Sequence, residues 1–164
     1  MLKILIPDHY YDNISCIDLE ILKEKGIKHV ICDLDNTLDS HNQKTPSETA
    51  LAFLNKLRDN GFLVCIISNG KHARVKKYLT DYPLHFTAQA GKPLKKSYIN
   101  AMAEIGAVPS STAFIGDQIF TDVLGANLVG LTTVLVEPIE SIENAFFHIK
   151  RPLEKIVKAK IVKE

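Results

Sequence analysis

Short apolar runs alternate along the chain with segments in which apolar residues recur every three or four positions. The runs are rich in β-branched residues and are bounded by glycine, asparagine or aspartate, which is typical of buried strands. The spaced positions predict helices that bury one face. The predicted strands, in chain order, are 29–33, 62–67, 85–88, 112–116 and 131–136.

Start and stop signals bound the predicted helices. Ser15-Cys-Ile-Asp18 resembles a capping box, and Gly26 ends the helix that follows. The sequence Thr45-Pro-Ser-Glu48 predicts a helix with Thr45 as its N-cap, ending at Asn60-Gly61. Further helices are predicted around Val75–Leu79, from Pro93 to Gly106, over about 122–129, and from about 140 to 164.

Strands that alternate with helices favour an α/β protein. We expect a Rossmann-like, three-layer α/β/α domain around a mostly parallel, five-stranded sheet. The whole chain, 1–164, fits one domain, with a core over about 28–137 and a helical tail over about 140–164. In such sheets, ligands bind beyond the carboxyl ends of the strands, where the strand order reverses.

Composition and charge narrow the possible partners. The net charge of +1 gives no strong field toward nucleic acid, so no nucleic-acid partner is expected. Three cysteines without a Cys-x-x-Cys pair favour neither a disulfide framework nor a zinc site, and a cytoplasmic location is expected. The longest apolar stretch, 62–67, is too short to span a bilayer, and the apolar start of the chain is too short for a secretory signal.

Polar side chains gather at the predicted strand ends. Asp33 and Asp35 follow the first predicted strand, Ser68 follows the second and Asp117 the fourth, while Lys92 precedes a helix. Carboxylates two apart on an extended chain point the same way and repel each other, so a cation or proton is expected to offset their charge. A metal site is the first hypothesis. Each signal alone also fits an ordinary turn or a solvated strand end.

Four stretches together resemble one family pattern. They are Asp33-Leu-Asp-Asn-Thr37, Ser68-Asn69, Lys92-Pro93 and Gly116-Asp-Gln-Ile-Phe-Thr-Asp122. In this order they resemble the four motifs of the haloacid dehalogenase (HAD) superfamily, over roughly residues 28–136. The residues in and around these motifs most resemble those of the subclass IIIA phosphatases of the bacterial phosphatidylglycerophosphate phosphatase-like family.

The resemblance implies a role for each motif residue. Asp33 would attack phosphorus and form an aspartyl-phosphate, Asp35 would be the general acid and base, and Lys92 would balance the charge of Asp33 and the phosphoryl group. The residues that bind substrate phosphate would be Ser68, Asn69, Gly70 and Lys92. The cofactor would be Mg²⁺, held by side chains of Asp33 and Asp117 and the backbone carbonyl of Asp35, with Asp122 in support directly or through water.

The implied function is Mg²⁺-dependent hydrolysis of a phosphomonoester. Phosphatidylglycerophosphate is the first substrate candidate, and small phosphorylated metabolites or nucleotides are alternatives. The short segments 39–44 and 68–92 leave no room for a large cap domain, so the open site suits a phosphate on a large partner such as a lipid headgroup, or an oligomeric neighbour as lid. Two alternatives of another class are a receiver-like phospho-acceptor and a non-catalytic scaffold. Asp35 favours hydrolysis over the receiver, and the intact set of Asp33, Asp35, Lys92 and Asp117 argues against the scaffold.

The C-terminal segment allows two interpretations. Residues 150–164 carry six basic and two acidic side chains, and Leu153, Ile156, Val157 and Ile161 fall on one helical face. The segment could make peripheral membrane contact, or it could pack on the core with a solvated basic face. Packing on the core is favoured, because amphipathic surface helices are common.

Overall fold

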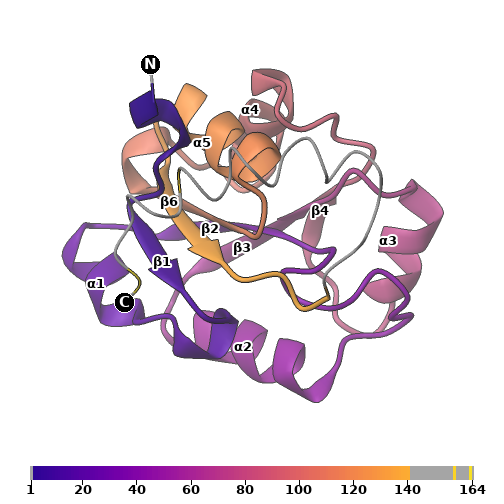
Figure 1. The fold of residues 1–164 in the computed structure, drawn as a ribbon. Helices are drawn as coiled ribbons and strands as arrows, with labels where there is room; N and C mark the ends of the chain where they lie inside the picture. The colour runs from indigo at the N-terminus through magenta and orange to yellow at the C-terminus, as the bar shows by residue number, and fades with distance from the viewer. Residues whose placement is uncertain (1, 141–156, 158–162, 164) are drawn as a thin grey trace.

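The chain forms one parallel sheet with helices on both faces (Figure 1). The computed structural model describes residues 2–140, Val157 and Lys163. The strands are β1 (His9–Tyr11), β2 (His29–Asp33), β3 (Leu63–Ile67), β4 (His85–Thr87), β5 (Thr112–Gly116) and β6 (Thr132–Val136). The α-helices are α1 (Leu19–Glu24), α2 (Glu48–Asp59), α3 (His72–Tyr78), α4 (Lys95–Glu104) and α5 (Leu124–Leu128). A π-helix covers Ile119–Val123, and short 3-10 turns cover Leu2–Leu5, Ile14–Cys16 and Pro109–Ser111.

The strand order is β1-β6-β5-β2-β3-β4, and every pairing is parallel. The predicted α/β fold is confirmed, but the sheet has six strands and not five. The strand that was missed, β1, has only three residues and pairs at the sheet edge with β6, from His9 opposite Val134 to Tyr11 opposite Val136. Its existence depends on a pairing across most of the chain, which a local pattern cannot reveal.

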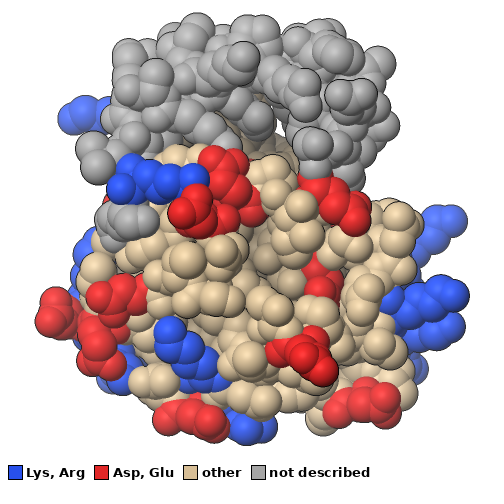
Figure 2. All heavy atoms as spheres, turned by 60° about the horizontal axis from the view of Figure 1, so that its bottom comes forward, with Lys and Arg blue, Asp and Glu red and all other residues tan. Residues whose placement is uncertain are grey.

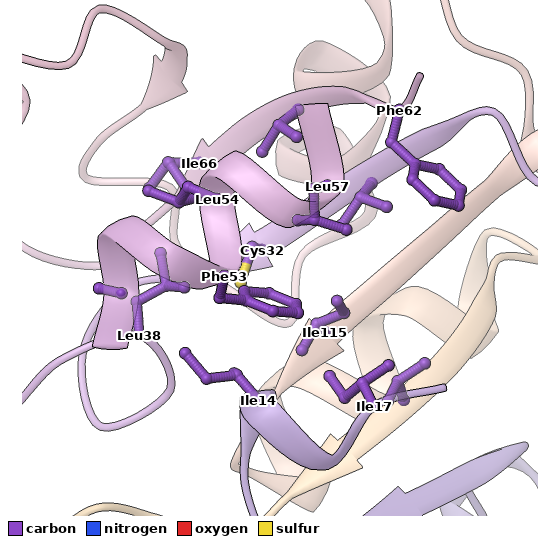
Figure 3. Packing of buried hydrophobic residues seen from close by; sticks show 14 of the residues in the cluster. Ile14, Ile17, Cys32, Leu38, Phe53, Leu54, Leu57, Phe62, Ile66 and Ile115 are labelled. Carbon is purple, nitrogen blue, oxygen red and sulfur yellow. The ribbon is translucent and has the colours of Figure 1, made fainter. Parts of the chain in front are cut away.

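Helices cover both faces of the sheet and bury its apolar side chains. On one face, α1, α2 and α3 pack over residues of alternate strand positions, such as Cys32 and Ile66. Figure 3 shows Phe53, Leu54 and Leu57 of α2 among these strand residues. On the other face, α4 and α5 cover the intervening positions, including Ile31, Cys65, Ile67 and Phe114. This period of two explains why the central strands are apolar throughout.

Three predicted helix starts are wrong, and for two of them a nearby polar side chain provides the cap instead. Helix α2 is capped by Ser47, whose hydroxyl accepts from the Ala50 N–H at 3.1 Å, and not by Thr45. Helix α1 is capped by Asp18 and not by Ser15. Helix α4 begins at Lys95, two residues after Pro93.

The connections put the carboxyl ends of β2 and β5 at the centre of the molecule. From β2 the chain moves outward through β3 and β4, then crosses back to β5 and moves outward the other way to β6. This reversal of strand order lies between β2 and β5, where ligands of open α/β sheets bind. The loop over 34–47 contains no helix or strand beyond one isolated bridge, and the β3–β4 connection contains only α3. A large cap domain is therefore absent from these two connections, as the sequence predicts.

The predicted tail over 140–164, with its membrane-binding alternative, lies almost entirely outside the described residues. Val157 is buried and packs with Tyr10 and Leu135. Lys163 pairs with the Asp12 carboxylate. Among the described residues, no helix has the length and apolar character needed to cross a bilayer.

We expect Leu57→Ala to destabilise the protein by about 2–5 kcal/mol, because it empties space in the core beneath α2. Leu51→Ala is the matched control, since Leu51 lies on the same helix but is only partly buried. Urea unfolding followed by circular dichroism measures both free energies. Equal losses for the two variants would contradict the packing of α2 described above.

Candidate active site

Three buried carboxylates from separate parts of the chain converge at the strand switch. Asp33 ends β2, Asp117 follows β5 directly, and Asp122 lies in the π-helix. One oxygen of each lies within 4.8 Å of the others. The parallel pairing of β2 with β5 accounts for this meeting, because it brings the ends of two strands that are far apart in the sequence to the same edge.

Lys92 is the cation of the cluster. Its Nζ lies 2.5 Å from Asp33 Oδ1 and 2.7 Å from Asp122 Oδ1, and its side chain is buried. Burial alone lowers the pKa of Lys92, but the attraction of Asp122 and Asp33 outweighs it, so the pKa is raised and the ammonium stays charged. The Lys92 N–H donates to Asn69 Oδ1 at 2.9 Å, which ties the lysine to the loop after β3.

Asp33 and Asp117 have carboxylates that are hard to ionise without a further cation. Burial is the main cause: it raises the pKa of Asp33 to about 7, although Lys92 opposes the shift. Burial, Asp122 and Asp33 raise the pKa of Asp117 well above its usual range. The Thr37 hydroxyl is within donating distance of both groups, 3.1 Å from Asp117 Oδ1 and 3.3 Å from Asp33 Oδ2.

Both oxygens of Asp122 are engaged by the protein. Oδ1 accepts from Lys92 and Oδ2 accepts from the Gln118 N–H at 3.0 Å. The π-turn fixes this geometry, since the N–H groups of Asp122 and Val123 both reach the Gln118 carbonyl. Gly116 leaves the necessary space: a Cβ at this position would lie 2.6 Å from Asp122. Asp122 therefore positions Lys92.

The donor set fits a divalent cation. Three ionised carboxylates against one ammonium leave two negative charges in excess, and buried charges need compensation. Carboxylate and carbonyl oxygens are the ligands that Mg²⁺ prefers, and nearby positive charge favours the ionised forms of Asp33 and Asp117.

Asp35 faces a different set of partners from those of Asp33. Its Oδ2 accepts from the Ser68 hydroxyl at 2.9 Å, and its Oδ1 lies 2.5 Å from Arg74 Nη2 and 3.2 Å from His41 Nδ1. The prediction that the side chains of Asp33 and Asp35 point the same way, toward one cation, is therefore wrong. Strand β2 ends at Asp33, so the regular alternation of side chains along the strand does not extend to Asp35, and Asn36 with a φ of 67° turns the chain directly afterwards.

The loop over Ser68–Gly70 lies against Asp35. Ser68 is buried, and its N–H donates to the Thr87 carbonyl at the end of β4. The Gly70 N–H donates to the Ser68 hydroxyl at 2.9 Å, so this donor is directed to the serine in this structure. Asn69 contacts Lys92 through its side chain. The predicted phosphate-binding residues are thus brought together between Lys92 and Asp35.

Three residues of the site were missed in the sequence: Thr37, His41 and Arg74. Thr37 carries a usable signal, because it stands four residues after Asp33 in the same motif and its hydroxyl reaches back to that carboxylate. His41 and Arg74 meet Asp35 only because the loop after β2 folds against α3: Arg74 also donates to the His41 carbonyl at 2.7 Å. No local pattern in the sequence reveals that contact.

Comparison with known proteins agrees with this geometry. The family model of haloacid dehalogenase-like hydrolases matches residues 18–130. The chain is 33% identical over 153 residues to the "Probable phosphatase YqeG" of Bacillus subtilis, covering 93% of this chain and 89% of that protein.

Two further comparisons are more distant. The chain is 26% identical over 160 residues to phosphatidylglycerophosphate phosphatase 1 of Arabidopsis thaliana, covering 88% of this chain but only 44% of that protein. The fold is similar to that of a HAD phosphatase from Thermococcus onnurineus, with a TM-score of 0.55, 17% identity, and coverage of 77% of this chain and 98% of that one. With a family match over most of its length and the four motifs gathered at one strand switch, the chain belongs to the haloacid dehalogenase-like hydrolases.

Proposed function

We propose that the protein is a Mg²⁺-dependent phosphatase that hydrolyses a phosphomonoester through an aspartyl-phosphate on Asp33. Hydrolysis of phosphate esters follows from the family and from the phosphatase-named relative. The observation that carries the finer proposal is the buried ion pair of Asp33 with Lys92, placed beside two more carboxylates. This arrangement holds a nucleophile next to the charges that phosphoryl transfer has to neutralise.

The proposed reaction has two half-reactions, and Asp33 and Asp35 act in both. In the first, an Asp33 oxygen forms a bond to phosphorus while the bond from phosphorus to the leaving oxygen breaks, and Asp35 donates a proton to that oxygen. In the second, Asp35 takes a proton from a water molecule, whose oxygen bonds to phosphorus as the bond to Asp33 breaks. The products are an alcohol and inorganic phosphate.

Charge and metal complete the proposed site. Lys92 balances charge on Asp33 and the phosphoryl group, and Ser68, with the N–H groups of Asn69 and Gly70, holds phosphate oxygens. Mg²⁺, when held by Asp33, Asp117 and the Asp35 carbonyl, would supply positive charge for the phosphoryl oxygens. Because both Asp122 oxygens already accept hydrogen bonds, support of the metal through water is the favoured role for that residue.

A receiver-like phospho-acceptor is the main alternative of another class. A receiver depends on a long-lived phosphoaspartate, so a second carboxylate that acts as general acid and base beside the nucleophile is not expected in it. The hydrogen bond from Ser68 and the contacts with Arg74 and His41 hold Asp35 in place, which favours hydrolysis over storage of the phosphoryl group. The presence of Asp33, Asp35, Lys92 and Asp117 together argues against a non-catalytic scaffold.

Phosphatidylglycerophosphate is the substrate that we propose first, with small phosphorylated metabolites or nucleotides as the alternative. Its support is the Arabidopsis relative of that name and the open site without a large cap. Peripheral membrane contact through the C-terminal segment and oligomerisation stay predictions. Of the described tail residues, Val157 packs on the core and Lys163 pairs with Asp12.

We expect Asp33→Asn to lower the hydrolysis of para-nitrophenyl phosphate with Mg²⁺ by at least about 10³-fold, because the amide is a poor nucleophile. Asp59→Asn, an exposed aspartate on α2, is the matched control and should retain wild-type turnover. Steady-state release of nitrophenolate gives the rates. Robust turnover by Asp33→Asn would refute covalent catalysis at this residue.

We expect Asp35→Asn to slow hydrolysis most for substrates with poor leaving groups, because an alkoxide needs a proton more than a nitrophenolate does. We expect the loss of kcat to be clearly larger with glycerol 3-phosphate than with para-nitrophenyl phosphate. Phosphate release with each substrate measures the two losses. An equal loss with both would show that Asp35 is not the general acid.

Added Mg²⁺ should raise the melting temperature of the wild-type protein, because it relieves repulsion among the buried carboxylates. At a hundredfold excess over its dissociation constant, the shift should be roughly 5–10 °C. Asp117→Asn should reduce the shift, whereas the exposed Asp81→Asn should preserve it. Scanning calorimetry with and without Mg²⁺ provides the measurement, and an unchanged wild-type melting temperature in millimolar Mg²⁺ would argue against this metal site.

A further inference from the structure

A basic hollow opens beside the proposed active site. Its volume is about 450 Å³, and its lining includes His41 and Lys44 from the loop after β2 together with Arg74 and Lys77 from α3. None of the residues that line it is acidic. Basic side chains also gather at one edge of the face shown in Figure 2, on the side of the molecule where α3 lies in Figure 1.

The hollow adjoins Asp35 through two of its own residues. Arg74 Nη2 and His41 Nδ1 both contact Asp35 Oδ1, at 2.5 Å and 3.2 Å. In the proposed reaction Asp35 protonates the leaving oxygen, so the group attached to that oxygen lies near Asp35. The leaving group would therefore lie next to residues that line the hollow, and the inference rests on the proposed function in this respect.

The positive charge of the hollow is only partly balanced. Arg74 is paired with Asp35, but its Nη1 is buried and has no hydrogen-bond partner among the described residues. Lys44 and Lys77 are exposed, and neither side chain has an ion pair or hydrogen bond with another residue in the described part of the chain. Clustered cations repel one another, so an anionic ligand between them would be attracted.

We infer that the hollow is a subsite for a second anionic group on the leaving group of the substrate. The substrate class is then a phosphomonoester whose alcohol also carries a phosphodiester or a further phosphate. A glycerophospholipid headgroup and a soluble bisphosphate both offer this chemistry. A monoester with an uncharged alcohol would leave Lys44 and Lys77 without a ligand.

The test compares substrates that differ in the second anion. The probes are glycerol 3-phosphate, fructose 1,6-bisphosphate, deacylated phosphatidylglycerophosphate, and intact phosphatidylglycerophosphate in detergent micelles. We expect wild-type kcat/KM for at least one two-anion probe to exceed that for glycerol 3-phosphate by roughly tenfold or more. The double variant Lys44→Ala/Lys77→Ala should lose most of this ratio, mainly through a higher KM.

A neighbouring lysine provides the matched control. Lys76 lies on α3 beside Lys77 but does not line the hollow, so Lys76→Ala should keep the wild-type ratio. A preference for the bisphosphate over the deacylated lipid would point to a soluble source, and the reverse to a headgroup. A wild-type enzyme without preference for a second anion, or a double variant with the full preference, would overturn the subsite.

A binding measurement separates this inference from the proposed reaction. Glycerophosphoglycerol contains the phosphodiester but no phosphomonoester, so calorimetric titration reports on the hollow alone. Binding to wild type that weakens several-fold in the double variant supports the subsite even if no phosphate ester is hydrolysed. Failure of glycerophosphoglycerol to bind overturns it even if para-nitrophenyl phosphate is hydrolysed and the proposed function stands.

Discussion

The ion pairs of Lys92 hold the proposed site together. A buried ammonium is costly unless it is paired, and here it lies between Asp33 and Asp122, which come from different elements. The positive charge of Lys92 also reduces the repulsion among the three carboxylates, although one positive charge cannot balance three negative ones. Removing either aspartate would leave Lys92 with one partner in a dry environment. The π-turn, the space at Gly116 and the Asn69 contact all serve to keep this cation in one place.

The parallel sheet makes such a charge cluster possible. Ends of β2 and β5 are adjacent because the chain reverses its direction of strand addition between them, and no other pair of neighbouring strands has this property in the described fold. The apolar strands are buried on both faces and fix the positions of Asp33 and Asp117. The acidic part of the site is thus anchored on the packed core of the sheet. The hollow, by contrast, is built from a loop and a short surface helix.

The sequence predicts this site well wherever chemistry is tied to a strand end. Asp33, Ser68 and Asp117 are found where the apolar runs stop, and the alternation of elements is enough to place them at one edge. It predicts poorly where a distant contact decides the local structure. Strand β1 exists only through pairing with β6, and Ser47 is the cap of α2 because its N–H is held by the Asp39 carboxylate at 2.9 Å. The pairing of Asp35 with α3 belongs to the same class.

The different surroundings of Asp33 and Asp35 suit two different tasks. The Asp33 side chain is 5% exposed and held by Lys92, so a nucleophile at this position is dry and has one orientation. The Asp35 side chain is 22% exposed, and a general acid and base has to exchange protons with a leaving group and with water. Strand β2 ends at Asp33, so the two environments differ although the two aspartates are only two positions apart. The contact of Asp35 with Arg74 links proton transfer to the basic hollow where the leaving group would lie.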